Sequence, residues 1–191
     1  MSDAHGAGST VVADLVAHQE RQRRLGFFGI YRGKVISVGT SSSDKEGRLG
    51  QLKVAVPDVY GSEQQTLPWA NCVVPFAGDN YGVMMLPKEG DGVWVQFEAG
   101  NKDLPVWVGA WYAQNKALPD GAAAETRVVR TPKGHTIVLD DDGNLVQLTH
   151  KDGQKITLSS DSIKLEVNNG CTVEIGQSSV KINDTALEVS K

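Results

Sequence analysis

The sequence predicts an all-β protein, with a small antiparallel barrel in its middle and an oligomeric, strand-rich stretch at its C-terminal end. Apolar and polar residues alternate at period two in many short runs after residue 27, which is typical of half-buried strands. Turn residues recur at nearly constant spacing after residue 126. No long helical pattern interrupts these runs, so helices contribute little beyond the N-terminal region.

The C-terminal stretch, residues 126–191, repeats a unit of strand, polar turn and strand. Gly134, Gly153 and Gly170 are spaced by 19 and 17 residues. Two of them follow Asp or Asn, and Asp-Gly and Asn-Gly tolerate the positive φ angles of tight hairpin turns. Each unit therefore reads as a hairpin with one buried face.

Nothing else in this stretch can cover the apolar face of its strands. A fully buried Val, Ile or Leu contributes about 1.5–3 kcal/mol, so leaving about sixteen of them in water outweighs the ~5–15 kcal/mol that stabilises a typical domain. Identical copies of the chain are the economical cover, and we expect an intertwined trimeric β-helix or β-prism. A monomeric meander that closes as a sandwich is the alternative. The expected trimer core consists of Ile137, Leu139, Val146, Leu148, Ile156, Leu158, Ile163, Leu165, Val167, Val173, Ile175, Val180, Ile182, Leu187 and Val189.

Residues 27–112 contain about five or six longer strands without an intervening long helix, which indicates a small barrel of the OB type. The residues from 113 to 125 are rich in Ala, Asn, Pro, Asp and Gly and predict a linker. The expected strands of the barrel are residues 31–38, 49–57, 69–74, 93–98 and 105–112.

Residues 1–26 predict a flexible N-terminus with a helix that begins at Ser9 or Thr10 and ends near Arg24, because Ser and Thr are good N-caps. Two interpretations remain open for this helix. It is either a short surface helix or a docking handle for a neighbouring protein.

Composition excludes several classes. With 191 residues, 40% apolar and 22% charged, the chain has the composition of an ordinary soluble protein. Its net charge of -4 argues against a nucleic-acid partner, which needs a basic surface. Cys72 and Cys171 lack the spacing of a zinc site or a disulfide framework. No apolar run approaches the ~20 residues of a membrane span, and the first residues lack signal-peptide character.

Catalytic machinery is not expected. A nucleophile, a base and an orienting group are needed for hydrolysis, and the histidines at positions 5, 18, 135 and 150 do not assemble into such a set. Asp140-Asp141-Asp142-Gly143-Asn144 lacks the spacing and terminal Glu of an EF-hand loop and reads as an acidic turn. We therefore predict no catalytic, cofactor-binding or metal residues, and a protein that is not an enzyme.

The four tryptophans could stack sugars or bases, as some OB barrels do. Because the chain is acidic, packing in the core and at interfaces is the better interpretation. The residues concerned are Trp69, Trp94, Trp107 and Trp111.

Several motifs of the middle region occur together and in order: residues 48–54, 67–70, 82–87, 90–91, 93–98 and 103–109. Together they resemble the phage baseplate assembly protein V family, which includes the OB-fold domains of contractile-tail spikes and of the VgrG spikes of type VI secretion. The resemblance covers about 85 residues. Thr-Pro-Lys-Gly-His-Thr-Ile at residues 131–137 resembles the start of the family's β-helix.

The resemblance implies a trimeric central spike of a baseplate, with the C-terminal strands forming a needle that sheath contraction drives through the target cell envelope. The implied partners are hub and tube proteins on the N-terminal side, a PAAR-like tip protein at the C-terminal end and, transiently, the target membrane. Synthesis in a bacterial cytoplasm and assembly into a phage tail or injection-system particle are implied as well.

This sequence departs from some relatives. Only residues 113–125 lie where certain spikes carry a lysozyme domain, the long hub domains of VgrG are missing before the barrel, and the last unit holds no His for an iron-binding apex. Two further function classes stay open beside the spike. One is an OB-type carbohydrate- or nucleic-acid-binding module on an oligomerisation stalk, and the other is an envelope-degrading enzyme.

Overall fold

A computed structural model describes residues 16–17, 26–39, 48–61, 67–113, 118–184 and 186–190. The chain folds as two units, residues 1–113 and residues 114–191, which are described here separately. Val16 and Ala17 are helical. The rest of the helix expected between residues 9 and 24 lies outside the described residues.

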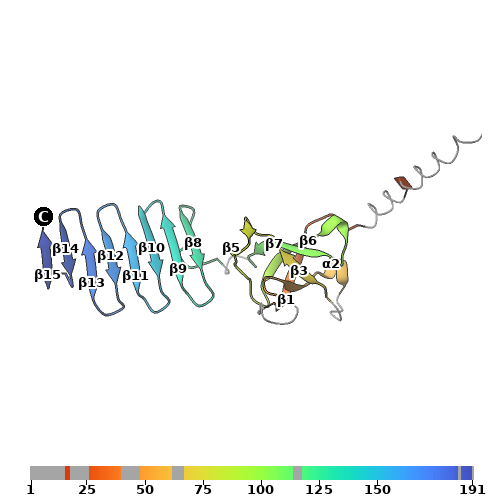
Figure 1. Ribbon diagram of the computed structural model, residues 1–191, viewed down its shortest axis with the longest axis horizontal. Helices are drawn as coiled ribbons and strands as arrows, with labels where there is room; N and C mark the ends of the chain where they lie inside the picture. The colour runs from red at the N-terminus through yellow and green to blue at the C-terminus, as the bar shows by residue number, and fades with distance from the viewer. Residues whose placement is uncertain are drawn as a thin grey trace, which may run out of the picture. The chain divides into compact units, whose positions relative to one another are not determined.

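The first unit contains a closed five-stranded barrel in the order β1-β2-β3-β7-β6 (Figure 1). This finding confirms the barrel of the OB type that the sequence predicts. Its strands are β1 (Tyr31–Val38), β2 (Leu52–Ala55), β3 (Trp69–Cys72), β6 (Gly92–Phe97) and β7 (Pro105–Trp111).

One ladder of the barrel is parallel, whereas the sequence predicts an antiparallel barrel. Strand β3 pairs with β7 through Asn71↔Val106 and Cys72↔Trp107, and the other four ladders are antiparallel. The reason is topological: five strands close into a ring only if the free edge of β3 meets β7, and these two strands run in the same direction.

Short elements connect the barrel strands. Helix α2 (Pro57–Tyr60) follows β2 and carries Pro57 at its first turn, where the missing N–H of proline costs nothing. Strands β4 (Ala77–Gly78) and β5 (Tyr81–Gly82) form a small hairpin, and the 3-10 helix η1 (Glu98–Gly100) follows β6.

The side chains inside the barrel form one aliphatic and aromatic core. Trp107 is 6% exposed, and its Nε1 donates a hydrogen bond of 3.2 Å to the carbonyl oxygen of Gly50, as buried indole N–H groups require. Gly33 leaves room for Val54, because a Cβ at this position would lie 2.3 Å from Val54 Cγ1. The core residues are Val35, Leu52, Val54, Val56, Ala70, Val93, Val95, Phe97 and Trp107.

Tyr60 connects α2 to the loop after η1. Its hydroxyl donates a hydrogen bond of 2.6 Å to the carbonyl oxygen of Lys102. Burial and the nearby carboxylate of Asp103 raise the pKa of Tyr60 to about 12, because both disfavour the phenolate. The neutral tyrosine is therefore the form that stabilises this corner.

The second unit is one sheet of eight strands, each of which pairs antiparallel with the next in sequence (Figure 1). We call this sheet the blade. Its strands are β8 (Thr126–Arg130), β9 (Thr136–Asp140), β10 (Leu145–Thr149), β11 (Lys155–Leu158), β12 (Ile163–Glu166), β13 (Thr172–Ile175), β14 (Ser179–Ile182) and β15 (Leu187–Ser190).

The tight turns of the blade use the residues that the sequence suggests. Gly134 and Gly153 have φ angles of 99° and 97°, and Asn169 has a φ of 53°, in the region that glycine and asparagine tolerate. Every ladder of the blade lies within one chain, and within the described residues no second sheet covers it. The alternative of a closed monomeric sandwich is therefore wrong, because the hairpins continue as a single layer.

Candidate functional site: the aliphatic face of the blade

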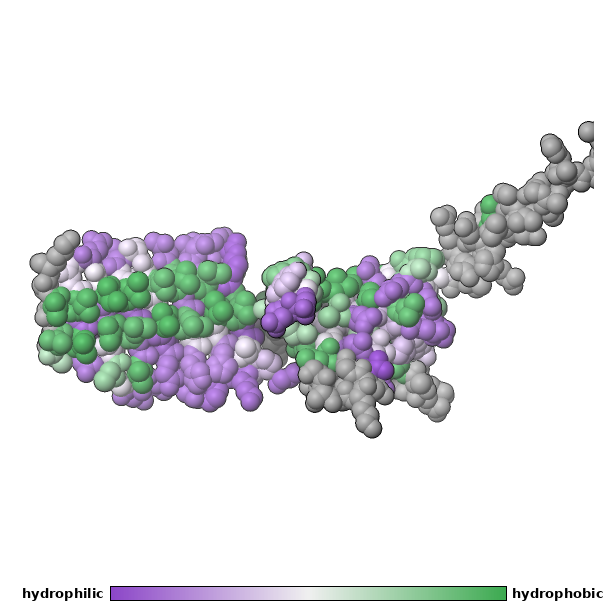
Figure 2. Space-filling model, in the orientation of Figure 1, coloured by the Kyte–Doolittle hydropathy of each residue, from purple (hydrophilic) through white to green (hydrophobic). Residues whose placement is uncertain are grey.

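One face of the blade carries two rows of aliphatic side chains (Figure 2); one row runs from β9 to β15 and the other from β8 to β15. The register of the ladders defines both rows. The first row is Leu139, Val146, Leu158, Ile163, Ile175, Val180 and Val189. The second row is Val129, Ile137, Leu148, Ile156, Leu165, Val173, Ile182 and Leu187. We call the two rows together the aliphatic face.

The aliphatic face is open to solvent in a single chain. Apart from the half-buried Val173, its side chains are between 36% (Ile182) and 62% (Val189) exposed. A shallow groove of about 380 Å³ lies on this face between Leu148 and Val173. Contiguous apolar patches of this extent are rare on monomers and mark interaction surfaces.

The opposite face of the blade is built for water. Lys164 lies beside Glu174, and Glu174 lies beside Lys181 in the ladder, so opposite charges alternate across the strands. Lys155 and Lys164 each lie 3.2 Å from a carboxylate oxygen of Glu166. Hydrogen bonds from Lys164 and then Lys155 lower the pKa of Glu166. The opposite face is therefore suited to contact with water, whereas the aliphatic face is not.

All the residues that the sequence places in the trimer core belong to these two rows except Val167. Val167 lies just after β12, where its backbone N–H donates to the carbonyl oxygen of Cys171 at 3.0 Å. Sequence reasoning missed Val129, which opens the second row. Val128 and Val129 are consecutive, so alternation alone does not say which valine lies on the aliphatic face; their register with β9 does.

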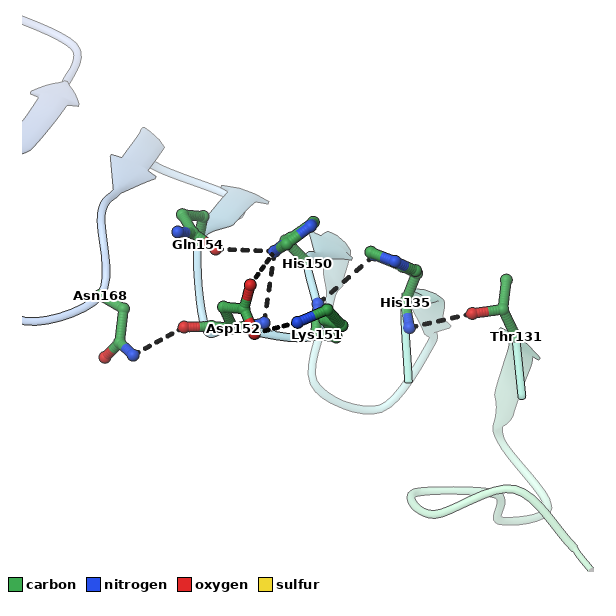
Figure 3. A network of polar contacts seen from close by, with 7 residues as sticks. All are labelled: Thr131, His135, His150, Lys151, Asp152, Gln154 and Asn168. Carbon is green, nitrogen blue, oxygen red and sulfur yellow. Dashed lines mark hydrogen bonds and ion pairs between the residues drawn. The ribbon is translucent and has the colours of Figure 1, made fainter. Parts of the chain in front are cut away.

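His135 and His150 come together at one margin of the blade, which the sequence did not suggest. His135 lies in the turn between β8 and β9, and His150 lies in the turn between β10 and β11. The centroids of the two imidazole rings lie 4.5 Å apart (Figure 3). Asp152 forms an ion pair with Lys151, and His150 Nδ1 lies 3.5 Å from a carboxylate oxygen of Asp152. The hydrogen bond from Lys151 is the main cause that lowers the pKa of Asp152.

Asp140 to Asn144 form the turn between β9 and β10 at the other margin. Asp140 Oδ1 accepts a hydrogen bond of 2.9 Å from the N–H of Gly143, and Asp141 Oδ2 lies 3.4 Å from Arg127 Nη1. Across the part of the chain that the structure describes, no three His, Cys, Asp and Glu side chains are grouped so that they could hold a metal ion.

Cations of the chain itself lie over three half-buried indole rings of the barrel. Arg32 lies 5.4 Å from the ring centroid of Trp94 and 5.3 Å from that of Trp111. Trp69 has Arg48 at 5.6 Å and a lysine, Lys53, at 5.1 Å. These cation–π contacts give the rings partners within the barrel, so the structure does not favour them as stacking platforms for sugars or bases.

The fold and this face together define a class of protein: an OB-type barrel joined to a single-layer sheet whose aliphatic face has to be covered by other chains. No helix within the described residues is long and apolar enough to cross a membrane.

Two comparisons with known families identify this class. Residues 31–112 match the type VI secretion system/phage-baseplate injector OB domain, and residues 126–188 match the phage baseplate V C-terminal trimerisation domain. The chain belongs to the phage baseplate assembly protein V family. Both matched domains are structural parts of a baseplate, so the protein has a structural role there, and the second match supports a homotrimer.

Proposed function

We propose that this protein is the central spike of the baseplate of a contractile tail or injection system, where three copies form a needle that pierces the target cell envelope when the sheath contracts. The observation that carries the proposal is the aliphatic face. It is exposed along the whole blade of one chain, and all of it except Val189 lies within the segment that matches a trimerisation domain.

Three blades cover one another if their aliphatic faces turn toward a common three-fold axis. Both rows then form the interior of a prism, and Lys164, Glu174 and Lys181 on the opposite face remain in water. The residues that the sequence assigns to the trimer core, together with Val129, fill this interior in the proposal. Val167 lies at its margin.

The order in which the strands of the blade pair suits a part that carries mechanical load. Because every strand of the blade pairs with its neighbour in sequence, the long sides of the blade consist of turns, and only β8 and β15 have a free strand edge. Continuous ladders without lateral edges leave few places for unravelling or for stray strand pairing. A rigid needle needs this property more than it needs chemistry, so no enzymatic step is part of the proposal.

Partners follow from the two ends of the chain. Hub and tube proteins bind on the N-terminal side, and the helix expected within residues 1–26 is a candidate docking element. At the other end, β15 is the last strand of the sheet, and Val189 on it is the most exposed residue of the aliphatic face. A PAAR-like tip protein would cover this end. Contact with the target membrane is transient, nucleic acid takes no part, and the chain is made in a bacterial cytoplasm before assembly into the particle.

The test uses the particle that carries this protein. A chain that ends after Gly176 lacks β14 and β15 and therefore gives a shorter needle. We expect baseplates with this chain to assemble and their sheaths to contract, as seen by electron microscopy, while depolarisation of target cells falls strongly. The matched control is Lys164→Ala on the solvent face, which leaves depolarisation unchanged. Full depolarisation by the shortened spike would contradict a piercing role.

A further inference from the structure

The two long margins of the blade carry opposite charge at the same level. One margin contains the turns of residues 131–135 and 150–154, with Lys133, His135, His150 and Lys151; we call it the basic margin. Figure 3 shows the last three of these side chains. The other contains the turn of residues 140–144, with three consecutive aspartates; we call it the acidic margin.

The basic margin carries more positive charge than its own carboxylate balances. Asp152 forms an ion pair with Lys151, whereas Lys133 is exposed and forms no ion pair with any described residue. The acidic margin has the reverse excess. Arg127 pairs with Asp141, and Asp142 has no ion pair among the described residues.

Each margin has a polar or charged side chain next to the aliphatic face. His150 lines the groove on that face together with Leu148 and Ile156. On the opposite margin Asp141 pairs with Arg127, which lies beside Leu139 of the first row in the ladder. Side chains at both margins are therefore placed where a neighbouring blade has to approach.

The charged groups sit at the two ends of the same pair of strands. His135 directly precedes β9 and Asp141 directly follows it; Asn144 directly precedes β10 and His150 directly follows it. If the three-fold axis runs along the direction in which the strands stack, equivalent turns of the three chains lie at the same height. Such an axis also brings unlike margins together, because contacts around a three-fold axis are heterologous. The basic margin of one chain thus meets the acidic margin of the next.

The remaining turns carry less charge. At the basic side of the blade, residues 167–171 are Val, Asn, Asn, Gly and Cys; at the acidic side, residues 159–162 contain one carboxylate, Asp161, and residues 176–178 are Gly, Gln and Ser. The aliphatic rows carry Val, Ile or Leu at nearly every level, so they distinguish poorly between chains at equal height and chains displaced by two strands, about 9.5 Å. A contact of two lysines with consecutive aspartates exists at one level only and does distinguish them, much as single polar positions set register in other assemblies.

We propose that Lys133, Lys151 and the His135–His150 pair of each subunit dock against the Asp141–Asp142 turn of the neighbouring copy, and that this contact sets the register of the trimer. The inference rests on the homotrimer and adds which residues meet between subunits. The occupant of each margin is a second copy of this chain, selected by charge complementarity.

The test is a mixing experiment with two full-length variants, Lys133→Asp and Asp142→Lys. Neither residue pairs with a described residue of its own chain, so both blades should fold. A homotrimer of either variant places like charges at all three contacts. A mixed trimer has one such contact and two attractive ones. We therefore expect mixed trimers to dominate after the two variants are unfolded and refolded together at low salt.

The readout is the distribution of trimer masses in native mass spectrometry, with one variant carrying a mass tag. Random assortment leaves about one quarter of the trimers as homotrimers, and we expect this fraction to fall more than about tenfold, because each contact between exposed charges is modest but two contacts change at once. Tagged and untagged parent chains give the random distribution. In 0.5 M salt the bias should shrink, because screening is then strong.

A random distribution for the variant mixture at low salt overturns the proposal. The double variant Lys133→Asp/Asp142→Lys provides the second measurement: it should refold alone into trimers with the yield of the parent, and a yield as low as that of the single variants also contradicts the contact. A parent protein that is monomeric by mass would instead remove the trimeric spike itself, so the two failures are distinct.

Discussion

Leu165→Asp tests whether the aliphatic face is the interior of the trimer. Leu165 lies in the second row, between Ile156 and Val173, and is 40% exposed in one chain. If three blades bury it, three carboxylates face the same axis in the variant. We expect the variant to lose its trimer at neutral pH while each blade stays folded.

The magnitude follows from the exposed fraction and from the carboxyl pKa. Burying the remaining 40% of Leu165 contributes about 0.6–1.2 kcal/mol per chain. A buried aspartate avoids its desolvation penalty by binding a proton, and holding an acid of ordinary pKa ~3.9 neutral at pH 7 costs about 4 kcal/mol. The sum is about 5 kcal/mol per chain and about 15 kcal/mol per trimer, which weakens the trimer by about ten orders of magnitude.

The pH dependence has a definite sign. Burial in the variant trimer raises the pKa of the carboxyl. The variant trimer is therefore not destabilised by this group below the ordinary carboxyl pKa, and the destabilisation grows as pH rises above it. Near pH 4 the cost of protonation falls below about 1 kcal/mol per chain. Analytical ultracentrifugation at pH 4 and pH 7 should therefore show the variant trimer returning at low pH, provided that the parent is trimeric at both.

Two controls make the result specific. Leu165→Asn leaves an unpaired amide in the interior, with a cost of about 1–3 kcal/mol per chain that does not change with pH. Thr157→Asp places the carboxylate on the solvent face beside Lys164 and should leave the trimer intact. A stable Leu165→Asp trimer at pH 7 would refute the assignment of this face, and Ile175→Asp repeats the test in the first row.

Three further predictions concern the barrel. Gly33→Ala brings a Cβ to within 2.3 Å of Val54 Cγ1. This overpacking should lower the free energy of unfolding, measured by denaturant titration, by about 1–3 kcal/mol. An unchanged midpoint would show that the two strands move apart easily and would contradict the prediction. Trp107→Phe removes the buried hydrogen bond to Gly50 and some core volume, and thermal unfolding should show a loss of about 2–4 kcal/mol. Because the pKa of Tyr60 is about 12 in the folded barrel and about 10 in the unfolded chain, its stabilisation is complete below pH 10 and is lost as pH rises toward 12. Between pH 9.5 and pH 11.5 the free energy of unfolding, measured by denaturant titration, should therefore decrease less for Tyr60→Phe than for the parent protein.

Local sequence patterns predicted much of the fold. Period-two alternation located β1, β6 and β7 of the barrel to within about a residue at each end, because each strand has one buried side. The same alternation, with glycine and asparagine at the turns, predicted the hairpins of the blade. Motifs in residues 48–109 were sufficient to suggest the family to which the chain belongs.

Other features depend on which strands become neighbours, and this information is spread over distant residues. The parallel contact of β3 with β7 follows from closure of the ring rather than from either strand alone. Val129 is assigned to the second row by its pairing with Ile137, since Val128 satisfies the alternation equally well. The trimer core itself stays a prediction until the tests above are made.

By itself, the sequence determined that the chain makes short amphipathic strands and that the last third has more aliphatic surface than one chain can bury. A structural function was what the family resemblance implied. Alternation and turn chemistry are local, so they can be read along the chain. Only the tertiary structure decided that the strands of the blade pair within one chain as an open layer, and that His135 and His150 meet at one margin while Asp141 and Asp142 lie at the other. Those facts depend on ladder register, which links residues that are not adjacent in sequence.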